Sequence, residues 1–407
     1  MEEWKEYKFE DICKGKGTYG IAASAVPYSD SLYTYLRITD INDDGTLNKQ
    51  GLMSVDDENA GNYILHPNDI VFARTGNSTG RSYFYDGSDG ELVYAGFLIK
   101  FSLDEAKVNP RMLKYYTHSK PYYDWVRSFD TGGTRGNINA KTYGAMSIVL
   151  PPRKIQDRIV SILKSLDDKI EVNRRISENL EQQAQALFKS WFVDFEPFRD
   201  GEFVESELGM IPKGWKVKEL ADIAVISKVS INPQKQPQTE FKHYSIPSYD
   251  DGMKPEIQLG EEIKSNKFVI RNKMTLFSKL NPRIKRVWFL DKMDDNSICS
   301  TEFVPYKAKE ESKSTLLYSL INSQGFYDFV MSMVNGATGS HQRFHPEDSL
   351  KYKIAYNETC SLKYCEIATP VINKILDNRD ESRRLATLRD TLLPKLMSGE
   401  LKVNDVD

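Results

Sequence analysis

The chain has 407 residues, which is room for two or three domains, and 40% of them are hydrophobic, so each domain can bury a core. Its net charge of −3 gives no overall attraction to nucleic acids or membranes, although residues 264–290 carry eight Lys and Arg and no Asp or Glu. The four cysteines have no zinc-site spacing, and no apolar run reaches the ~18 residues of a membrane span, so we expect a reduced, soluble protein of the cytoplasm.

Residues 1–152 predict a globular domain that mixes strands and helices. Hydrophobic spacing predicts a short helix from Trp4 to Ile12 and a longer helix over residues 111–127. Runs rich in β-branched and aromatic residues predict strands, and Pro151-Pro152 ends the last of them. The predicted strands are residues 34–41, 70–74, 82–85, 92–101 and 146–150.

Residues 153–195 predict one long helix. The side chains at seven-residue intervals from Ile159 are mostly apolar. The side chains four residues after each of these positions form a second, mostly apolar series. A stripe of this width is typical of a helix that packs in a bundle. Glu196-Pro197 ends the helix, and a polar linker occupies residues 196–213.

The second half of the sequence repeats the first. Residues 214–360 follow the plan of the first domain, and residues 361–400 predict a second long helix. The two helices align without a gap, because one offset (378 − 173 = 205) relates Asn173 to Asn378 and Leu180 to Leu385. A glycine tract near residue 133 also recurs near residue 337. The sequence is therefore an internal repeat of a domain followed by a helix.

Two amphipathic helices of this length need a partner for their apolar stripes, and the nearest partner of each is the other. A pseudo-two-fold axis between the repeats would make the pair antiparallel, with Asn173 near Asn378 at its centre. We therefore predict an α+β fold in which two pseudo-symmetric globular domains are separated by two long helices packed as an antiparallel coiled coil. The residues expected at the helix interface are Leu166, Ile170, Asn173, Leu180, Leu187, Trp191, Val371, Ile375, Asn378, Leu385 and Leu392.

Sequence motifs for catalysis and metal binding are incomplete. Residues 15–20 satisfy GxGxxG but do not follow an apolar strand, as a dinucleotide site requires. Residues 40–45 begin like an EF-hand loop, yet Gly51 stands where a bidentate Glu is needed. The five histidines have no metal-ligand spacing. We find no catalytic constellation and no metal site, and we expect catalytic residues to be absent.

Long runs in both helices and in the linker resemble those of one known family. The runs read LDDKI at 166–170, ALFKSWFVDFEP at 186–197, ELGMIPKGW at 207–215 and LRDTLLPKLMSGEL at 388–401. Through them the chain resembles, over nearly its whole length, the specificity subunit of Type I restriction–modification systems.

The resemblance implies that both globular domains are target recognition domains, each reading half of a split DNA sequence. It implies two DNA methyltransferase subunits as partners, together with restriction subunits that carry translocase and nuclease activity. S-adenosylmethionine, ATP and magnesium would be used by those partners, whereas this subunit would be non-catalytic and hold no cofactor. The family has no universal base-reading residues, so these must be sought in the sequence itself.

Candidate DNA contacts combine basic, amide and hydroxyl side chains, which bind phosphates or read base edges. They lie in the basic strip of residues 264–290, in the loop of residues 74–80 and in the two glycine tracts, whose small residues would let backbone N–H groups approach phosphates. The candidates are Arg74, Thr75, Asn77, Ser78, Thr134, Arg135, Asn137, Lys273, Lys279, Asn281, Arg283, Thr338, Ser340, His341, Gln342 and Arg343.

Two other interpretations stay open at this point. The chain could be a self-sufficient, magnesium-dependent restriction endonuclease whose nuclease site lies in the acidic segment 250–264, where Asp251, Glu262 and Lys264 form a loose carboxylate–lysine set. It could also be a coiled-coil scaffold without a DNA role. The scaffold hypothesis leaves the repeated glycine tracts and the basic strip unexplained.

Overall fold

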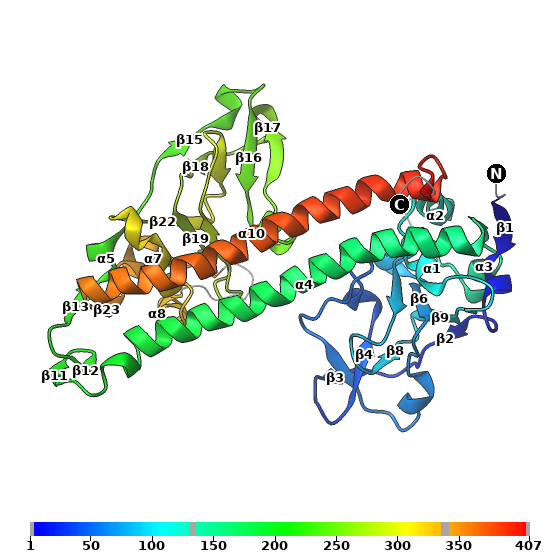
Figure 1. Cartoon of the computed structure of the whole chain (residues 1–407), viewed down its shortest axis with the longest axis horizontal. Helices are drawn as coiled ribbons and strands as arrows, with labels where there is room; N and C mark the ends of the chain where they lie inside the picture. Colours follow the sequence, from blue (N-terminus) through cyan, green and yellow to red (C-terminus); the bar gives the residue numbers. More distant parts are fainter. Residues whose placement is uncertain (1–3, 130–135, 335–341, 404–407) are drawn as a thin grey trace. The chain divides into compact units, whose positions relative to one another are not determined.

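The computed structural model describes residues 4–129, 136–334 and 342–403. Its contacts divide the chain into two units, Met1–Val172 with Glu381–Asp407, and Asn173–Asp380. Each unit holds one globular domain, part of the long helix α4 (Arg153–Phe192) and part of the long helix α10 (Glu358–Met397). In each unit the two long helices lie side by side (Figure 1).

The domain of the first unit is built on two four-stranded sheets. Their strand orders are β2-β9-β6-β7 and β3-β5-β4-β8, with β4 and β8 parallel, and β1 pairs separately with β10. The strands are β1 (Lys5–Lys8), β2 (Thr18–Tyr19), β3 (Ala25–Pro27), β4 (Tyr33–Leu36), β5 (Met53–Val55), β6 (Asp69–Ala73), β7 (Ser82–Tyr85), β8 (Leu92–Tyr94), β9 (Leu98–Ser102) and β10 (Ser147–Leu150).

The second unit uses the same plan. Its sheets have the orders β14-β22-β19-β20 and β15-β18-β21-β16-β17, and β13 pairs with β23 and β11 with β12. The strands are β11 (Phe203–Ser206), β12 (Gly209–Pro212), β13 (Lys216–Glu219), β14 (Ala224–Ile226), β15 (Ser230–Ile231), β16 (Glu240–Tyr244), β17 (Glu256–Leu259), β18 (Lys267–Val269), β19 (Met274–Ser278), β20 (Val287–Leu290), β21 (Ser297–Cys299), β22 (Phe303–Ala308) and β23 (Lys353–Tyr356).

One central strand in each unit is buried on both faces. Every residue of β6 and of β19 is buried. Because side chains alternate along a strand, Phe72 of β6 packs into the core that includes α4, while Val71 packs into the core of the second sheet. In β19, Phe277 and Leu276 divide in the same way. These strands therefore fix the position of the loops that follow them.

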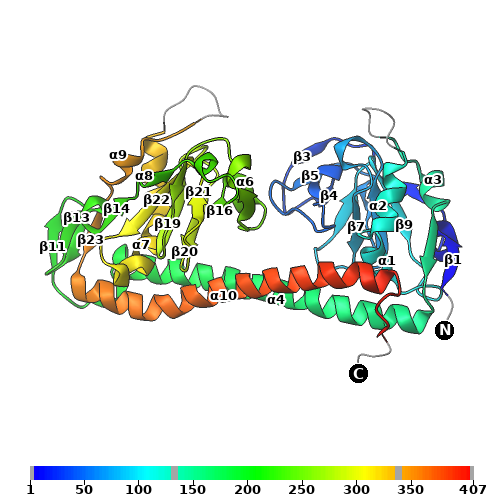
Figure 2. The same cartoon turned by 90° about the horizontal axis from the view of Figure 1, so that it is seen from above.

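The short helices cover the sheets. Figure 2 shows α1 in the first unit and α7 in the second lying between the sheet and the helix pair. The helices are α1 (Pro110–Tyr116), α2 (Lys120–Arg127) and α3 (Ala140–Gly144) in the first unit, and α5 (Leu220–Ile223), α6 (Ile246–Asp250), α7 (Ser314–Ile321), α8 (Gln324–Ser332) and α9 (Pro346–Ser349) in the second.

Several sequence predictions of secondary structure were wrong, and the predicted strand of residues 92–101, for example, is the two strands β8 and β9. The stretch from Trp4 to Ile12 is strand β1 followed by a 3-10 turn, because β1 pairs with the distant strand β10. The predicted helix over residues 111–127 is two helices, α1 and α2. Pro121 lies in the first turn of α2, where its missing N–H costs nothing, but it could not continue a helix arriving from α1.

The long helices pack antiparallel within each unit. In the first unit, Ile159 and Leu163 near the start of α4 share a core with Leu393 and Leu396 near the end of α10. In the second unit, the end of α4 shares a core with the start of α10, where Phe188 meets Tyr364 with ring centroids 6.1 Å apart. The predicted α+β fold with two domains and an antiparallel helix pair is thus confirmed.

The predicted helix-interface residues differ in burial. Asn173, Ile375 and Asn378 are each 1% exposed. The other predicted residues are half-buried: Leu166, Ile170, Leu180, Leu187, Trp191, Val371, Leu385 and Leu392. Phe188, Ile372 and Leu393, each one position further along, are buried instead. The reason is that the domain cores close over the helices and shift the buried face. None of the helices in the described residues is long and apolar enough to cross a membrane.

Candidate DNA interface

In the first unit, three separate segments meet at the end of β6. The N–H of Arg74, which directly follows β6, donates to the carbonyl of Phe97 at 3.1 Å, and its carbonyl accepts from the N–H of Ile138 at 3.0 Å. Phe97 lies in the turn between β8 and β9, and Ile138 follows the first glycine tract. These bonds bring the predicted loop of residues 74–80 beside the flank of the tract.

The exposed side of this junction carries an arginine and two aromatic rings. The guanidinium of Arg74 lies over the ring of Tyr19, 5.0 Å from its centroid. Tyr19 is 41% exposed and Phe97 is 58% exposed, and the Tyr19 hydroxyl accepts from the N–H of Ala140 at 3.1 Å. A stacked guanidinium is oriented to meet a phosphate or a guanine edge, while exposed rings can pack on bases or sugars. Sequence reasoning missed Tyr19 and Phe97, because no pattern marks an aromatic residue as exposed.

The second unit repeats the junction at the end of β19. The N–H of Lys279, which follows β19 as Arg74 follows β6, donates to the carbonyl of Glu302 at 2.8 Å. The N–H of Asn281 donates to the carbonyl of Gln342 at 2.8 Å. The strand-following loop and the flank of the second glycine tract are therefore joined, as in the first unit.

The side chains at the second junction are different. The guanidinium of Arg343 donates to both carboxylate oxygens of Glu302, at 3.1 and 3.2 Å. These bonds raise the pKa of Arg343 above its usual value, so the side chain stays charged. They use the N–H of Nε and one N–H of Nη2, so the two N–H groups of Nη1 and the second N–H of Nη2 remain as donors. Arg283, in the loop after β19, is exposed.

The basic strip of residues 264–290 is not one surface. Lys273 lies at the opposite end of β19 from Lys279 and pairs with Asp291. Lys267 and Arg286 are each 7% exposed, and Arg286 donates to both oxygens of Asp250 at 2.6 and 2.8 Å. The prediction of a continuous cationic strip was therefore wrong, because sequence gives the charges but not the directions in which the side chains point.

Comparison with known proteins finds similarity to one family, both in a family model and in individual relatives. Residues 1–182 match the family model described as the Type I restriction modification DNA specificity domain. The chain is 28% identical to the Type I restriction enzyme MjaIX specificity subunit of Methanocaldococcus jannaschii, over 72% of this chain and 69% of that one. It is 24% identical to the HindI specificity subunit of Haemophilus influenzae, over 98% of this chain and 100% of that one.

A solved structure shows the same fold. It is the crystal structure of a Type I restriction–modification S subunit from M. genitalium, with a TM-score of 0.59 and 14% identity over 97% of this chain and 96% of that chain. The chain is therefore similar to specificity subunits of Type I restriction–modification systems in sequence over nearly its whole length, and it shares their fold. Residues 1–182 match a DNA specificity domain, which is the class of site that both strand-end junctions suggest.

The remaining predicted DNA contacts lie in different environments. Asn77 and Asn137 are exposed, Thr75, Lys279, Asn281 and Gln342 are half-buried, and Ser78 is buried at 7% exposure. Thr134, Arg135, Thr338, Ser340 and His341 lie outside the described residues.

The acidic segment proposed for a nuclease has a structural role instead. Asp250 ends α6 and is engaged by Arg286, and the carboxylate of Glu262 accepts from the N–H of Leu259 at 2.8 Å. Among the residues that the structure describes, no group of three His, Cys, Asp or Glu side chains could hold a metal ion. The endonuclease alternative therefore gains no support from the geometry of this segment.

Proposed function

We propose that this chain is a specificity subunit that reads a bipartite, asymmetric DNA sequence, with one half-site for each unit. The observation that carries the proposal is the repeated junction at the ends of β6 and β19. The bond made by the residue after the strand is the same in the two units, but Arg74 with Phe97 in one corresponds to Lys279 with Glu302 in the other, and each loop is also bonded to the flank of a glycine tract. Equal scaffolds with unequal side chains would contact two different base sequences in equivalent ways.

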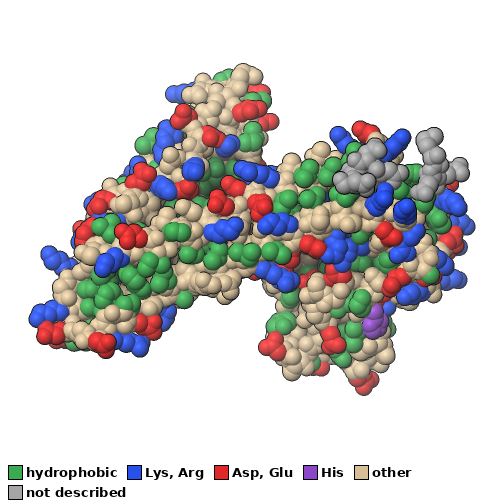
Figure 3. All heavy atoms as spheres, viewed as in Figure 1, with side chains coloured by type: hydrophobic (Ala, Val, Ile, Leu, Met, Phe, Trp, Pro, Cys, Tyr) green, Lys and Arg blue, Asp and Glu red, His purple; other side chains and the backbone are tan. Residues whose placement is uncertain are grey.

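We further propose that two DNA methyltransferase subunits and, in the restriction complex, the translocase–nuclease subunits bind this chain. The subunit itself would be non-catalytic, and S-adenosylmethionine, ATP and magnesium would be used by those partners in the cytoplasm. Support comes from apolar side chains that are exposed on the long helices, where Figure 3 shows hydrophobic atoms at the surface. They are Val172, Ile176, Leu362, Ile367 and Leu388.

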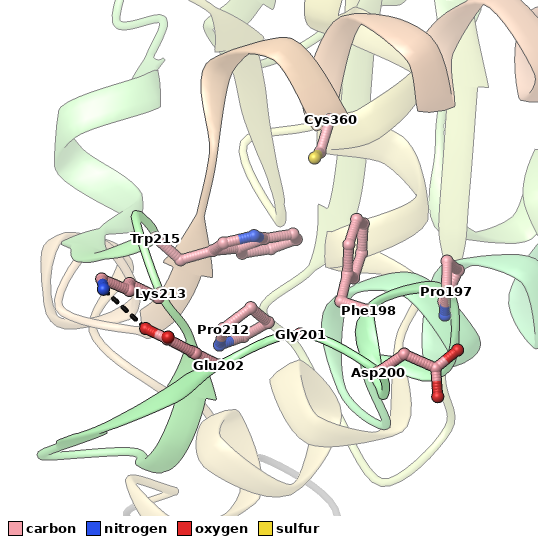
Figure 4. A pocket seen from close by; sticks show the side chains of 9 residues that line it. All are labelled: Pro197, Phe198, Asp200, Gly201, Glu202, Pro212, Lys213, Trp215 and Cys360. Carbon is pink, nitrogen blue, oxygen red and sulfur yellow. Dashed lines mark hydrogen bonds and ion pairs between the residues drawn. The ribbon is translucent and has the colours of Figure 1, made fainter.

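A pocket in the second unit adds to this surface. It has a volume of about 540 Å³ and lies where the linker after α4 meets the start of α10. Figure 4 shows the Trp215 ring between Cys360 and Pro212, Phe198 beside it, and the Lys213–Glu202 ion pair at the edge. Apolar walls with a charged edge suit an apolar side chain of a partner subunit.

Affinity purification of the tagged chain from its own host, followed by native mass spectrometry, tests the partner proposal. We expect a complex with two copies of a methyltransferase that binds S-adenosylmethionine. A chain that purifies alone and cleaves DNA with magnesium would support the endonuclease alternative and contradict the proposal.

A further inference from the structure

Two neighbouring basic residues of the loop after β19 point into the protein. Lys285 donates through Nζ to the carbonyl of Asn322 at 2.5 Å, and Arg286 pairs with Asp250. Burial lowers the pKa of Lys285, while the nearby Glu181 opposes that shift. Among the basic residues of this loop, Arg283, two residues before Lys285, is the exposed one. The loop is therefore held from inside on one flank, next to the arginine that we propose to contact DNA.

The contact from Lys285 continues to the helix pair. Asn322, at the end of α7, donates through its Nδ2 atom to Oε1 of Glu181 on α4 at 2.7 Å. Oε1 also accepts from the hydroxyl of Tyr318 at 2.5 Å, and Arg379 of α10 lies 3.6 Å from Oε2. Glu181 is thus fixed by both the domain and α10. All these residues belong to the second unit.

We infer that Glu181, Asn322 and Lys285 form a relay that positions the loop of residues 279–286 for reading the second half-site. This inference rests on the proposed function. In it, Lys285 contacts no DNA, and Glu181 acts only through Asn322. All three are positioning residues, whereas Arg283 is the residue that would contact the DNA.

The first unit shows that the fold does not require this relay. The loop after β6 has the same length as the loop after β19, and Gly80 stands where the second unit has Lys285 (285 − 80 = 205). There the Tyr122 hydroxyl of α2 donates to the carbonyl of Gly80 at 2.6 Å. Val126 leaves no space for a side chain at position 80, because a Cβ placed there would lie 2.5 Å from a methyl carbon of Val126. Since a loop of this length folds without a lysine, Lys285 has a role specific to the second unit.

The test uses the whole complex and a labelled duplex that carries its target, identified by methylation mapping. Binding is measured against duplexes with one base pair changed in either half-site, at several salt concentrations. We expect Lys285→Met to reduce discrimination at the second half-site about tenfold, the scale of one lost base contact, and to leave the first half-site unchanged. The salt slope, which is the change in log binding affinity with log salt concentration, should not change, because Lys285 contacts no phosphate. Lys279 directly follows β19 and is one of the proposed DNA contacts, so Lys279→Met should lower the slope by about 1.

A second variant separates the relay from a local contact. Asn322→Ala keeps the carbonyl that binds Lys285 but removes the amide that binds Glu181. We expect it to lower discrimination as much as Lys285→Met does, and the double variant to lose no more than either single variant. The relay would be overturned by any of three results: Asn322→Ala leaves discrimination unchanged, the losses in the double variant add up, or Lys285→Met lowers the salt slope. Failure of the wild-type complex to distinguish two half-sites would instead overturn the proposed function.

Discussion

At the scale of single residues, position relative to a strand end separates structural cations from exposed ones. Arg286 is the last residue before β20 and is buried against Asp250, and Lys285 points to α7. Arg74, directly after β6, stacks on an exposed tyrosine. A buried cation requires a fixed partner, whereas a cation stacked at the surface retains donors for an incoming anion. Charge density in the sequence is therefore a weaker guide to DNA contact than the backbone junction.

Arg74→Ala and Arg283→Ala should each affect one half-site. If the arginine reads a base, we expect binding to weaken by roughly 1–3 kcal/mol for the half-site read by the altered unit. Fluorescence anisotropy with duplexes that vary in one half-site at a time is the measurement. Equal losses at both half-sites from either change would show that the arginines do not belong to separate reading surfaces.

At the scale of helices and strands, each domain is bound to the helix pair through an acid on α4. In the first unit, Asp167 accepts from Lys114 at 2.9 Å, from the hydroxyl of Tyr115 at 3.0 Å and from Arg389 of α10 at 3.0 Å. In the second unit, Glu181 takes the corresponding role with Tyr318 of α7. Both contacts link a domain helix, α4 and α10, so they hold domain and helix pair together.

Asp167→Asn should destabilise the first unit in a pH-dependent way. Burial would raise the pKa of Asp167, but Lys114 and Arg389 outweigh burial and hold it below its usual value. A lowered folded-state pKa stabilises above the unfolded value of about 4, and that stabilisation disappears as pH falls through the folded pKa. We expect a loss of about 1–3 kcal/mol at pH 7 that shrinks below pH ~4. Urea unfolding across this range checks it, and a loss that does not change with pH would contradict it.

Charges placed in the helix interface should break the assembly. Ile375 is 1% exposed and Leu180 is half-buried, so Ile375→Asp should cost several kcal/mol, with Leu180→Asp costing less. Lys374→Asp is the matched control, because Lys374 is exposed on the same helix, next to Ile375, and is not part of the apolar surface proposed for partner binding. Thermal unfolding and native mass spectrometry of the co-expressed complex are the measurements. Equal stability of Ile375→Asp and Lys374→Asp would place the interface on another face.

Sequence could predict the helices far better than the sites. The seven-residue pattern through Asn173 and Asn378 located both long helices, because helical contacts are local and repeat along the chain. The segment Trp4–Ile12 could not be assigned in this way, since its strand depends on a partner about 140 residues away (147 − 8 = 139). The DNA junctions depend on backbone bonds between distant loops, such as Arg74 with Phe97 and Ile138, and no local pattern encodes them.

At the scale of the whole molecule, the repeat gives two similar surfaces joined by continuous helices. Seven residues inserted after Val172 in α4 and seven after Asp380 in α10 would keep the apolar stripe in phase. They would add about 10 Å at ~1.5 Å per residue, or about three base pairs at ~3.4 Å each. We expect the unspecified gap in the target to grow by that amount while both half-sites stay the same. The control is a seven-residue insertion after Glu207, in the turn between β11 and β12, which should leave the gap unchanged.

Methylation mapping of the host genome decides whether one chain reads two different half-sites. Adenine methylation in cells that carry the gene is compared with methylation in cells that lack it. We expect one motif to disappear with the gene, and this motif should have two unlike specified parts separated by a fixed gap. An uninterrupted motif, a palindromic motif with identical halves, or no change in methylation would contradict it.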